Sequence, residues 1–146
     1  MNRRDALKVT GIAMAAAATQ AQATESKKEK TPMNRMEMKP ADPSKPTDYE
    51  LKHMPQITIK DKDAKGYTMV EITVGQKGII HPSTPDHWID FIELYADDTL
   101  VGKNILEADI SRGASAFAVK LDGVKKLTSK AGCNLHGIWT DSIMVS

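Results

Sequence analysis

The chain consists of short stretches of strand-forming residues separated by turn residues, and this pattern limits the folds open to it. Residues 67–74 (YTMVEITV), 88–96 (WIDFIELYA) and 115–121 (SAFAVKL) are rich in β-branched and aromatic residues and alternate in part between apolar and polar positions. Shorter strands are expected at residues 56–59, 100–103 and 137–145, with hairpin turns at Asp97-Asp98 and Asp122-Gly123. About seven strands without sustained helical periodicity predict an all-β fold, an antiparallel β-sandwich, although a barrel gives a similar pattern.

The N-terminal residues 1–23 have the layout of an export signal. Arg3 and Arg4 are followed by a weakly apolar stretch at residues 9–18 and by Ala21 and Ala23, which form a cleavage site of the small-x-small type. The apolar stretch is shorter than the roughly 20 residues that a membrane span requires. The paired arginines resemble a twin-arginine signal, which exports proteins that have already folded. We therefore expect a periplasmic protein with no membrane span in its mature form.

The mature chain is close to neutral. Removing residues 1–23 takes away three basic residues and one acidic residue, so the formal charge changes from +1 to −1. This leaves no basic surplus to support nucleic-acid binding.

Residues 24–47 are rich in Lys, Glu and Pro and contain no aromatic residue, Val or Ile, so we expect a disordered polar linker. The folded domain is then residues 48–146, which is long enough for a single core.

The four histidines and the single cysteine all lie in or beside expected loops. Imidazole nitrogen and thiolate sulfur are metal ligands, and a Cys-x-x-His turn lets both side chains reach one ion. Taken singly, such a cysteine is more often a small apolar residue, and such a histidine a hydrogen-bonded loop residue. The motifs HPSTPDH and CNLH together nevertheless indicate a metal site in a chain otherwise almost free of both residue types. The candidate ligands are His53, His81, His87, Cys133 and His136.

Three kinds of metal site can be compared with this ligand set. Structural zinc takes four ligands and usually several thiolates, so it fits poorly. A blue-copper site needs two histidines, a cysteine and a weak axial methionine, and Cys133, His136 and Met144 occur in that order. That site would leave two histidines unexplained. Four imidazoles and one thiolate suit a five-coordinate non-haem iron with an open sixth position.

The sequence HPSTPDHWIDFIELYADD, followed by CNLHG and preceded by KHMP at residues 52–55, closely resembles the superoxide reductase family. This family includes the iron domain of desulfoferrodoxin and neelaredoxin, and the resemblance covers residues 49–146. It implies an immunoglobulin-like β-sandwich with one mononuclear iron that cycles between Fe2+ and Fe3+. The implied equatorial ligands are His53, His81, His87 and His136, and the implied axial ligand is the thiolate of Cys133.

The resemblance also implies a reaction, the one-electron reduction of superoxide to hydrogen peroxide at the open sixth position. Lys52 directly precedes His53 and matches the family's lysine, whose ammonium attracts the anion and orders water for proton delivery. Longer relatives carry a second iron site built from four cysteines, which a chain with one cysteine cannot form. We therefore expect the one-iron form, with a separate and unidentified one-electron donor protein. A homo-oligomer is compatible with this interpretation.

One position departs from the family pattern. The family commonly has Glu-Lys-His where this chain reads Glu50-Leu51-Lys52-His53, so Leu51 occupies the position of a glutamate that closes on ferric iron. Glu50 is therefore not expected to be a ligand.

Two other classes of function remain open at this stage. One is a periplasmic copper electron carrier of the cupredoxin type. The other is a β-sandwich binding module that holds no metal.

Overall fold

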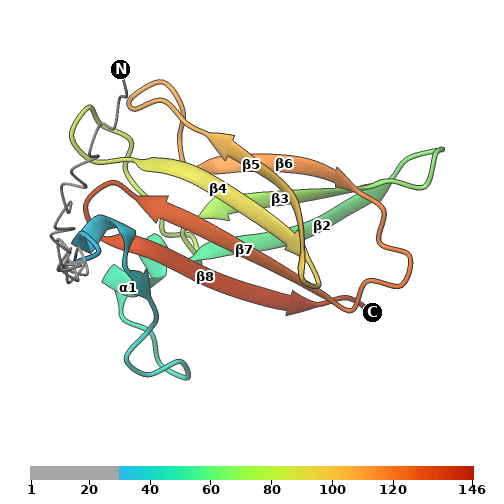
Figure 1. Cartoon of the computed structure of the whole chain (residues 1–146), viewed down its shortest axis with the longest axis horizontal. Helices are drawn as coiled ribbons and strands as arrows, with labels where there is room; N and C mark the ends of the chain where they lie inside the picture. The colour runs from blue at the N-terminus through green and yellow to red at the C-terminus, as the bar shows by residue number, and fades with distance from the viewer. Residues whose placement is uncertain (1–29) are drawn as a thin grey trace, which may run out of the picture.

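The computed structural model describes residues 30–146, which form a β-sandwich of two sheets. One sheet has the strand order β1-β8-β7-β4-β5 and the other has the order β2-β3-β6. Figure 1 shows the sheets as two layers, with the short helix α1 at one end. The elements are the 3-10 helix η1 (Met33–Arg35), β1 (Glu37–Met38), α1 (Asp48–His53), β2 (Pro55–Lys62), β3 (Thr68–Val74), β4 (Ile89–Ala96), β5 (Thr99–Ile105), β6 (Ala114–Val119), β7 (Lys126–Cys133) and β8 (Gly137–Met144).

The predicted all-β sandwich is confirmed, with β2 to β8 as its strands and β1 as an addition at one edge. The strands face inward as their alternation predicts: in β3, Val70, Ile72 and Val74 are fully buried, while the residues between them lie on the outer face. Apolar side chains from both sheets form one core between the layers. Of the described residues, no helix is long and apolar enough to cross a membrane.

The two expected turns have different roles. Asp97 and Asp98 form the tight connection between the paired strands β4 and β5, as predicted, and Asp97 has a positive φ of 49°. Asp122 and Gly123 also lie in a turn, but this turn joins β6 to β7. Because those two strands belong to different sheets, the expectation of a hairpin at Asp122-Gly123 is wrong.

Strand β7 was not among the stretches singled out from the sequence, although it is the middle strand of the five-stranded sheet. Its inward positions include Leu127, Ser129 and Ala131, and only the first is a large apolar residue. Ser129 is fully buried, and its hydroxyl donates a hydrogen bond of 2.9 Å to the carbonyl of Glu93. Because this bond satisfies the buried hydroxyl, a serine is tolerated at this position of a central strand.

The described part of the expected linker, residues 30–47, is folded against the sandwich. Strand β1 pairs in parallel with β8, so that Glu37 lies opposite Ile138 and Met38 lies opposite Trp139. A Cβ at Gly137 would meet Met38 Cγ and, at 2.8 Å, the carbonyl oxygen of Met36, and Gly137 has a φ of 91°. The prediction of a disordered linker therefore does not hold for this part. Residues 24–29 and the expected signal at 1–23 lie outside the described residues.

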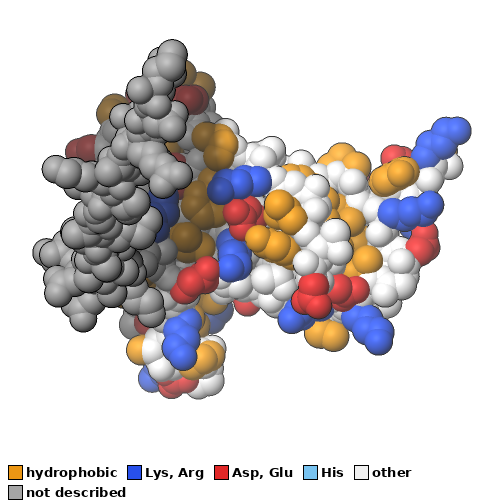
Figure 2. Space-filling view, viewed as in Figure 1, with side chains coloured by type: hydrophobic (Ala, Val, Ile, Leu, Met, Phe, Trp, Pro, Cys, Tyr) orange, Lys and Arg blue, Asp and Glu red, His pale blue; other side chains and the backbone are white. Residues whose placement is uncertain are grey.

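The outer face of the five-stranded sheet carries mixed charge. Figure 2 shows cationic and anionic side chains interspersed among apolar ones over the face turned to the viewer. Ion pairs join Lys103 to Glu93 at 3.3 Å and Lys130 to Glu37 at 2.9 Å. The second pair fastens β1 to β7, since its partners come from those two strands.

Candidate metal centre

The five candidate ligands come from four separate segments that meet at one end of the sandwich. His53 is the last residue of α1, and Cys133 is the last residue of β7. His136 lies in the turn between β7 and β8, and His81 and His87 lie in the connection from β3 to β4. The pairing of Ile89 with Cys133 places the His87 connection beside the Cys133 turn. Strand pairing therefore brings together ligands that are far apart in the sequence.

The four imidazoles form a closed ring. Neighbouring ring centroids are 5.0 Å apart for His53 and His81, 4.6 Å for His81 and His87, 5.0 Å for His87 and His136, and 5.0 Å for His136 and His53. The diagonal from His53 to His87 is longer, at 6.2 Å. Four sides of similar length and one longer diagonal are compatible with four imidazoles arranged around one ion.

Two of the imidazoles are oriented by hydrogen bonds from Nδ1, which lies on the other side of the ring from Nε2. Nδ1 of His53 donates to the carbonyl of Tyr49 at 2.7 Å, and Nδ1 of His81 donates to the carbonyl of Pro82 at 2.7 Å. Nε2 of His81 and Nε2 of His87 are buried and have no hydrogen-bond partner. Buried polar atoms without partners are rare, and a metal ion would satisfy these.

One ligand atom each from His53, His81, His87 and Cys133 lies within 4.8 Å of the other three. His136 is outside this set, but its Nδ1 is 3.1 Å from Nε2 of His53 and 3.6 Å from Sγ of Cys133. The structure thus brings all five predicted residues to one place, with four in the tighter group. Three nitrogens, a sulfur and an adjacent fourth nitrogen fit a single ion with mixed imidazole and thiolate ligands.

Burial favours the neutral form of three of the imidazoles, and the neutral form is the one that binds metals. It lowers the pKa of His53 to about 4 and that of His81 to about 3, and it also lowers the pKa of His87. Burial raises the pKa of the Cys133 thiol, while hydrogen bonds from the backbone N–H groups of Leu135 and His136 oppose this. A bound cation would favour the thiolate in the same place.

The chain was also compared with proteins of known sequence and structure. The sequence model of the desulfoferrodoxin family matches residues 45–142. The chain belongs to the desulfoferrodoxin family. It is 38% identical over 88 residues to the desulfoferrodoxin of Nitratidesulfovibrio vulgaris, a match that covers 60% of this chain and 60% of that protein. It is 31% identical over 103 residues to the superoxide reductase of Pyrococcus abyssi, covering 64% of this chain and 87% of the relative.

Solved structures agree with this assignment to the desulfoferrodoxin family. The one-iron superoxide reductase of Giardia intestinalis matches with a TM-score of 0.55 and 25% identity, over 64% of this chain and 98% of that one. Membership in this family, together with the three histidines and the cysteine of the tighter group, identifies a site that could bind a single iron.

A copper site of the cupredoxin type does not fit a desulfoferrodoxin domain with this geometry. Cys133 lies opposite Gly137 at the start of β8, whereas Met144 lies opposite Lys126 at the other end of the same strand pair. At about 3.3 Å per residue, the length of β8 separates Met144 from the imidazole ring by roughly 20 Å. Met144 therefore cannot be the axial ligand, and its side chain is 73% exposed.

Lys52 directly precedes His53 in α1, and its side chain is partly buried. Its Nζ is 5.7 Å from the centroid of the Tyr49 ring, which is within the range of a cation–π contact. Its positive charge also contributes to the lowered pKa values of His53, His81 and His87. The charge of Lys52 therefore acts electrostatically on three of the candidate ligands.

Tyr49 was not singled out from the sequence. Its ring packs on His53 at 4.6 Å and on His136 at 5.5 Å, and its carbonyl accepts the hydrogen bond from His53. The signal that could have found it is its position four residues before His53, where one turn of a helix brings the two together. The spacing of Thr47 and Glu50, which is that of a capping box, is a second signal for the short helix α1.

Glu50 is turned away from the imidazole ring. Its carboxylate accepts hydrogen bonds from the backbone N–H groups of Ala41 at 2.9 Å and Thr47 at 2.8 Å. The Glu50 N–H in turn donates to the Thr47 hydroxyl oxygen, which completes a capping box at the start of α1. Leu51, in the position of the family's glutamate, is buried. Neither Glu50 nor Leu51 therefore presents a carboxylate to the candidate iron site.

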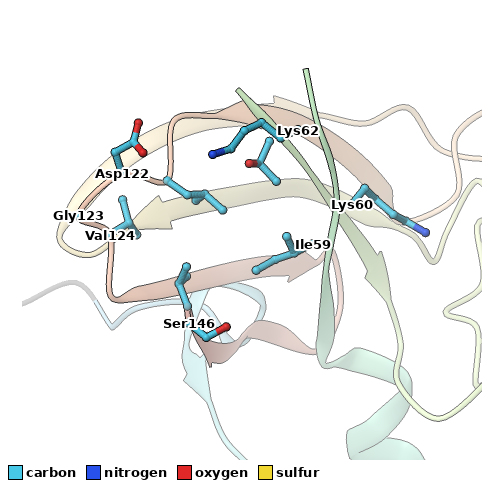
Figure 3. A pocket seen from close by; sticks show the side chains of 10 residues that line it. Ile59, Lys60, Lys62, Asp122, Gly123, Val124 and Ser146 are labelled. Carbon is cyan, nitrogen blue, oxygen red and sulfur yellow. The ribbon is translucent and has the colours of Figure 1, made fainter. Parts of the chain in front are cut away.

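A pocket of about 540 Å³ lies at the opposite end of the sandwich. It is lined by the end of β2, the start of β3 and the segments after β6 and β8, and no histidine or cysteine is among its lining residues. Figure 3 shows that the ammonium groups of Lys60 and Lys62 point in different directions, so they do not converge on a common ligand.

Proposed function

We propose that this protein is a superoxide reductase that converts superoxide to hydrogen peroxide at one mononuclear non-haem iron. The iron would be held by the imidazoles of His53, His81, His87 and His136 and by the thiolate of Cys133. The observation that carries the proposal is the pair of buried, unpartnered Nε2 atoms of His81 and His87, which belong to a ring of four imidazoles next to the only thiol. Relatives of the chain that are named superoxide reductases support the reaction.

The overall step consumes one superoxide anion, one electron and two protons and yields one molecule of hydrogen peroxide. Ferrous iron, when bound, supplies the electron, and a separate one-electron donor protein restores it. The protein's own contribution begins with the anion, because the Lys52 ammonium attracts superoxide toward the imidazole ring. Water ordered by that ammonium delivers the protons. The carbonyls of Tyr49 and Pro82 hold two imidazoles in the tautomer that presents Nε2.

The metal content and visible spectrum of the oxidised protein test this function, beside a Cys133→Ser variant. We expect one iron per chain and a thiolate-to-ferric charge-transfer band that is absent in the variant. Copper with an intense blue band would place the protein among electron carriers. A chain that takes up no metal after anaerobic loading with ferrous iron would show that the ring is not a metal site.

We also propose that residues 1–23 are a twin-arginine signal that exports the protein to the periplasm. The support is the sequence itself, with Arg3 and Arg4 before a short apolar stretch and a small-x-small site. The electron donor would then be a protein of that compartment. Fractionation of cells that produce the full chain and an Arg3→Lys, Arg4→Lys double variant tests this. We expect the mature protein in the periplasm and the variant in the cytoplasm, and equal distribution of the two would contradict the proposal.

A further inference from the structure

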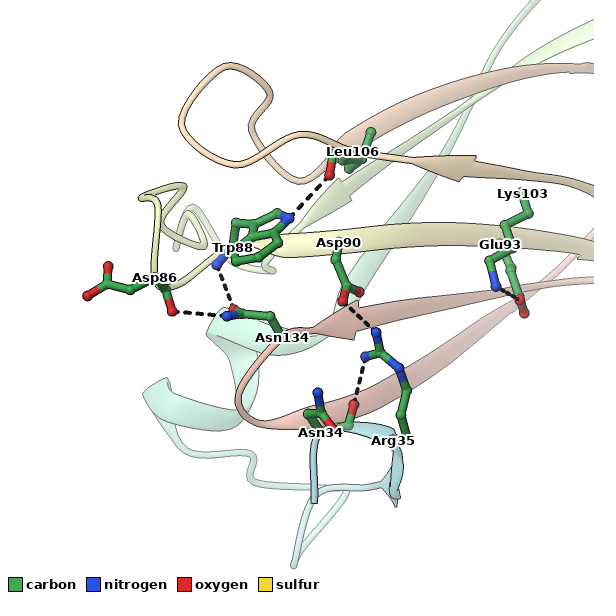
Figure 4. A network of polar contacts seen from close by, with 9 residues as sticks. All are labelled: Asn34, Arg35, Asp86, Trp88, Asp90, Glu93, Lys103, Leu106 and Asn134. Carbon is green, nitrogen blue, oxygen red and sulfur yellow. Dashed lines mark hydrogen bonds and ion pairs between the residues drawn. The ribbon is translucent and has the colours of Figure 1, made fainter. Parts of the chain in front are cut away.

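Asn134, which follows Cys133, connects the cysteine turn to the segment around His87. Its Oδ1 accepts a hydrogen bond of 2.9 Å from the backbone N–H of Trp88, and its Nδ2 donates one of 2.9 Å to the carbonyl of Asp86. Its backbone N–H donates a third bond of 3.1 Å to the carbonyl of Trp88. Figure 4 shows the Asn134 carboxamide facing the segment around His87, with one bond to Trp88 and one to Asp86.

These bonds are not those of an ordinary turn asparagine, which bonds to its own backbone two residues further on. The partners of Asn134 are 46 and 48 residues away in the sequence. Only a carboxamide offers one acceptor and one donor at this spacing. An aspartate would keep the bond from Trp88 but would place an oxygen against the carbonyl of Asp86.

The two partners of the carboxamide stand on either side of His87. The backbone of His87 itself is held by Thr84: the His87 N–H donates to the Thr84 carbonyl at 3.2 Å, and the Thr84 N–H donates to the His87 carbonyl at 2.9 Å. The Thr84 hydroxyl lies 3.1 Å from the same His87 N–H. Every backbone group from the Asp86 carbonyl to the Trp88 carbonyl therefore has a partner, and three of these partners belong to Asn134.

We propose that Asn134 is a positioning residue that fixes the His87 imidazole relative to the Cys133 thiolate. The proposal rests on the proposed function, since it assigns both side chains to one iron. Cys133 is joined to Asn134 by a peptide bond, and the carboxamide holds the residues before and after His87, so the distance between these two ligands is set by a short rigid connection. The angle between the thiolate and an imidazole affects the colour, the magnetic spectrum and the reduction potential of an iron centre.

The test compares Asn134→Ala and Asn134→Asp with the wild-type protein and with Asn104→Ala. Asn104 is a matched control, because its carboxamide also bonds across strands, to the Ser115 hydroxyl, on the exposed strand β5. The readouts are iron per chain, the energy of the thiolate-to-ferric band, the electron paramagnetic resonance spectrum of the ferric form and the midpoint potential. Circular dichroism records whether each variant is folded.

We expect Asn134→Ala to bind iron about tenfold or more weakly or, when loaded, to show a shifted band and an altered resonance spectrum. Asn134→Asp should show a change in the same readouts, while Asn104→Ala matches the wild type. Variants that are folded and loaded with a spectrum and potential equal to the wild type would overturn the proposal. Loss of the fold in both Asn134 variants would also overturn it, because Asn134 would then determine the fold and not the ligand geometry. A wild-type protein without iron would instead refute the proposed function.

Discussion

The backbone of Gly75 lies against that of Lys52, where the segment after β3 passes the end of α1. A Cβ on Gly75 would stand 2.8 Å from Lys52 Cα and 2.8 Å from the Lys52 carbonyl oxygen. The next residue, Gln76, donates its backbone N–H to the carbonyl of Leu51 at 2.9 Å. The position of Lys52 and His53 is therefore set by contact between two backbones, which no side chain can adjust.

A Gly75→Ala substitution is expected to displace the end of α1. The added methyl group meets backbone atoms, so the cost is that of overpacking, about 1–3 kcal/mol of unfolding free energy. Superoxide reduction should slow because Lys52 and His53 move with the helix. Gly78→Ala is the control, because its φ of 78° strains an alanine while the new Cβ meets nothing within 4 Å. It should lose about 1 kcal/mol and keep the rate, and equal rates in both variants would contradict the prediction.

Replacing Lys52 by glutamine should reduce the second-order rate with superoxide about tenfold and weaken its dependence on ionic strength. The reason is the loss of the cation that attracts the anion at the imidazole ring. Lys60→Gln removes the same charge at the opposite end of the sandwich, where Lys60 lines the pocket of about 540 Å³. Rapid-mixing or pulse measurements of ferrous iron oxidation compare the two variants. If Lys60→Gln slows the reaction as much, the effect is one of net charge and not of position.

Glu50→Gln should leave the ferric charge-transfer band unchanged. Both oxygens of the Glu50 carboxylate are used by backbone N–H groups near α1, and Leu51 supplies no carboxylate in its place. The sixth position of ferric iron would then be open to solvent or to added anions, so azide and cyanide should bind readily in wild type and variant alike. Visible spectra during azide and pH titrations check this. A ferric spectrum or pH titration that changes on substitution would identify Glu50 as a ligand.

The same substitution should change the stability of the protein at acid pH. Hydrogen bonds from the backbone N–H groups of Ala41 and Thr47 lower the pKa of Glu50 in the folded state. A lowered pKa stabilises the fold above the unfolded-state value of about 4.3, and this contribution is lost as the pH falls through the folded-state pKa. The difference in unfolding free energy between wild type and Glu50→Gln should thus be largest near neutral pH and shrink below about pH 4.

Urea unfolding followed by tryptophan fluorescence at several pH values measures this difference. Glu71→Gln, on the outer face of β3, is the control for removing a carboxylate from the sandwich. A Glu50→Gln difference that stays constant from pH 7 to pH 3 would contradict the assignment of the stabilising bonds to the ionised carboxylate.

Much of the candidate site was predictable, because four of its five ligands occur as two pairs of residues that are close together in the sequence. The spacing of His81 and His87, and of Cys133 and His136, marks a metal site without any knowledge of the fold, since each pair lies on one loop. The strands from β2 to β6 and β8 were also predictable, because their apolar and β-branched residues follow the period of a half-buried strand. Strand β7 was not, since Ser129 and Ala131 become good inward residues only when neighbouring strands supply a hydrogen bond or close packing.

The structure of the segment at residues 30–47 could also not be predicted from its own sequence. Its composition predicts a solvated linker, because it contains too little apolar surface to form a core of its own. In the folded protein it needs no core, since β1 adds to the edge of an existing sheet and Met38 packs over Gly137. A partner that is distant in sequence therefore determines its structure.

The sequence by itself determined the ligand types, their pairing on loops and the all-β character of the domain, because each depends on residues close together in the chain. Only the tertiary structure decided that four imidazoles close into a ring, that Met144 lies at the wrong end of β8 and that Glu50 caps a helix. These features depend on strand register and on contacts between residues far apart in the chain, as between His53 and His136, which are separated by 83 positions. Register follows from the packing of the whole sandwich, and no local pattern in the chain contains it.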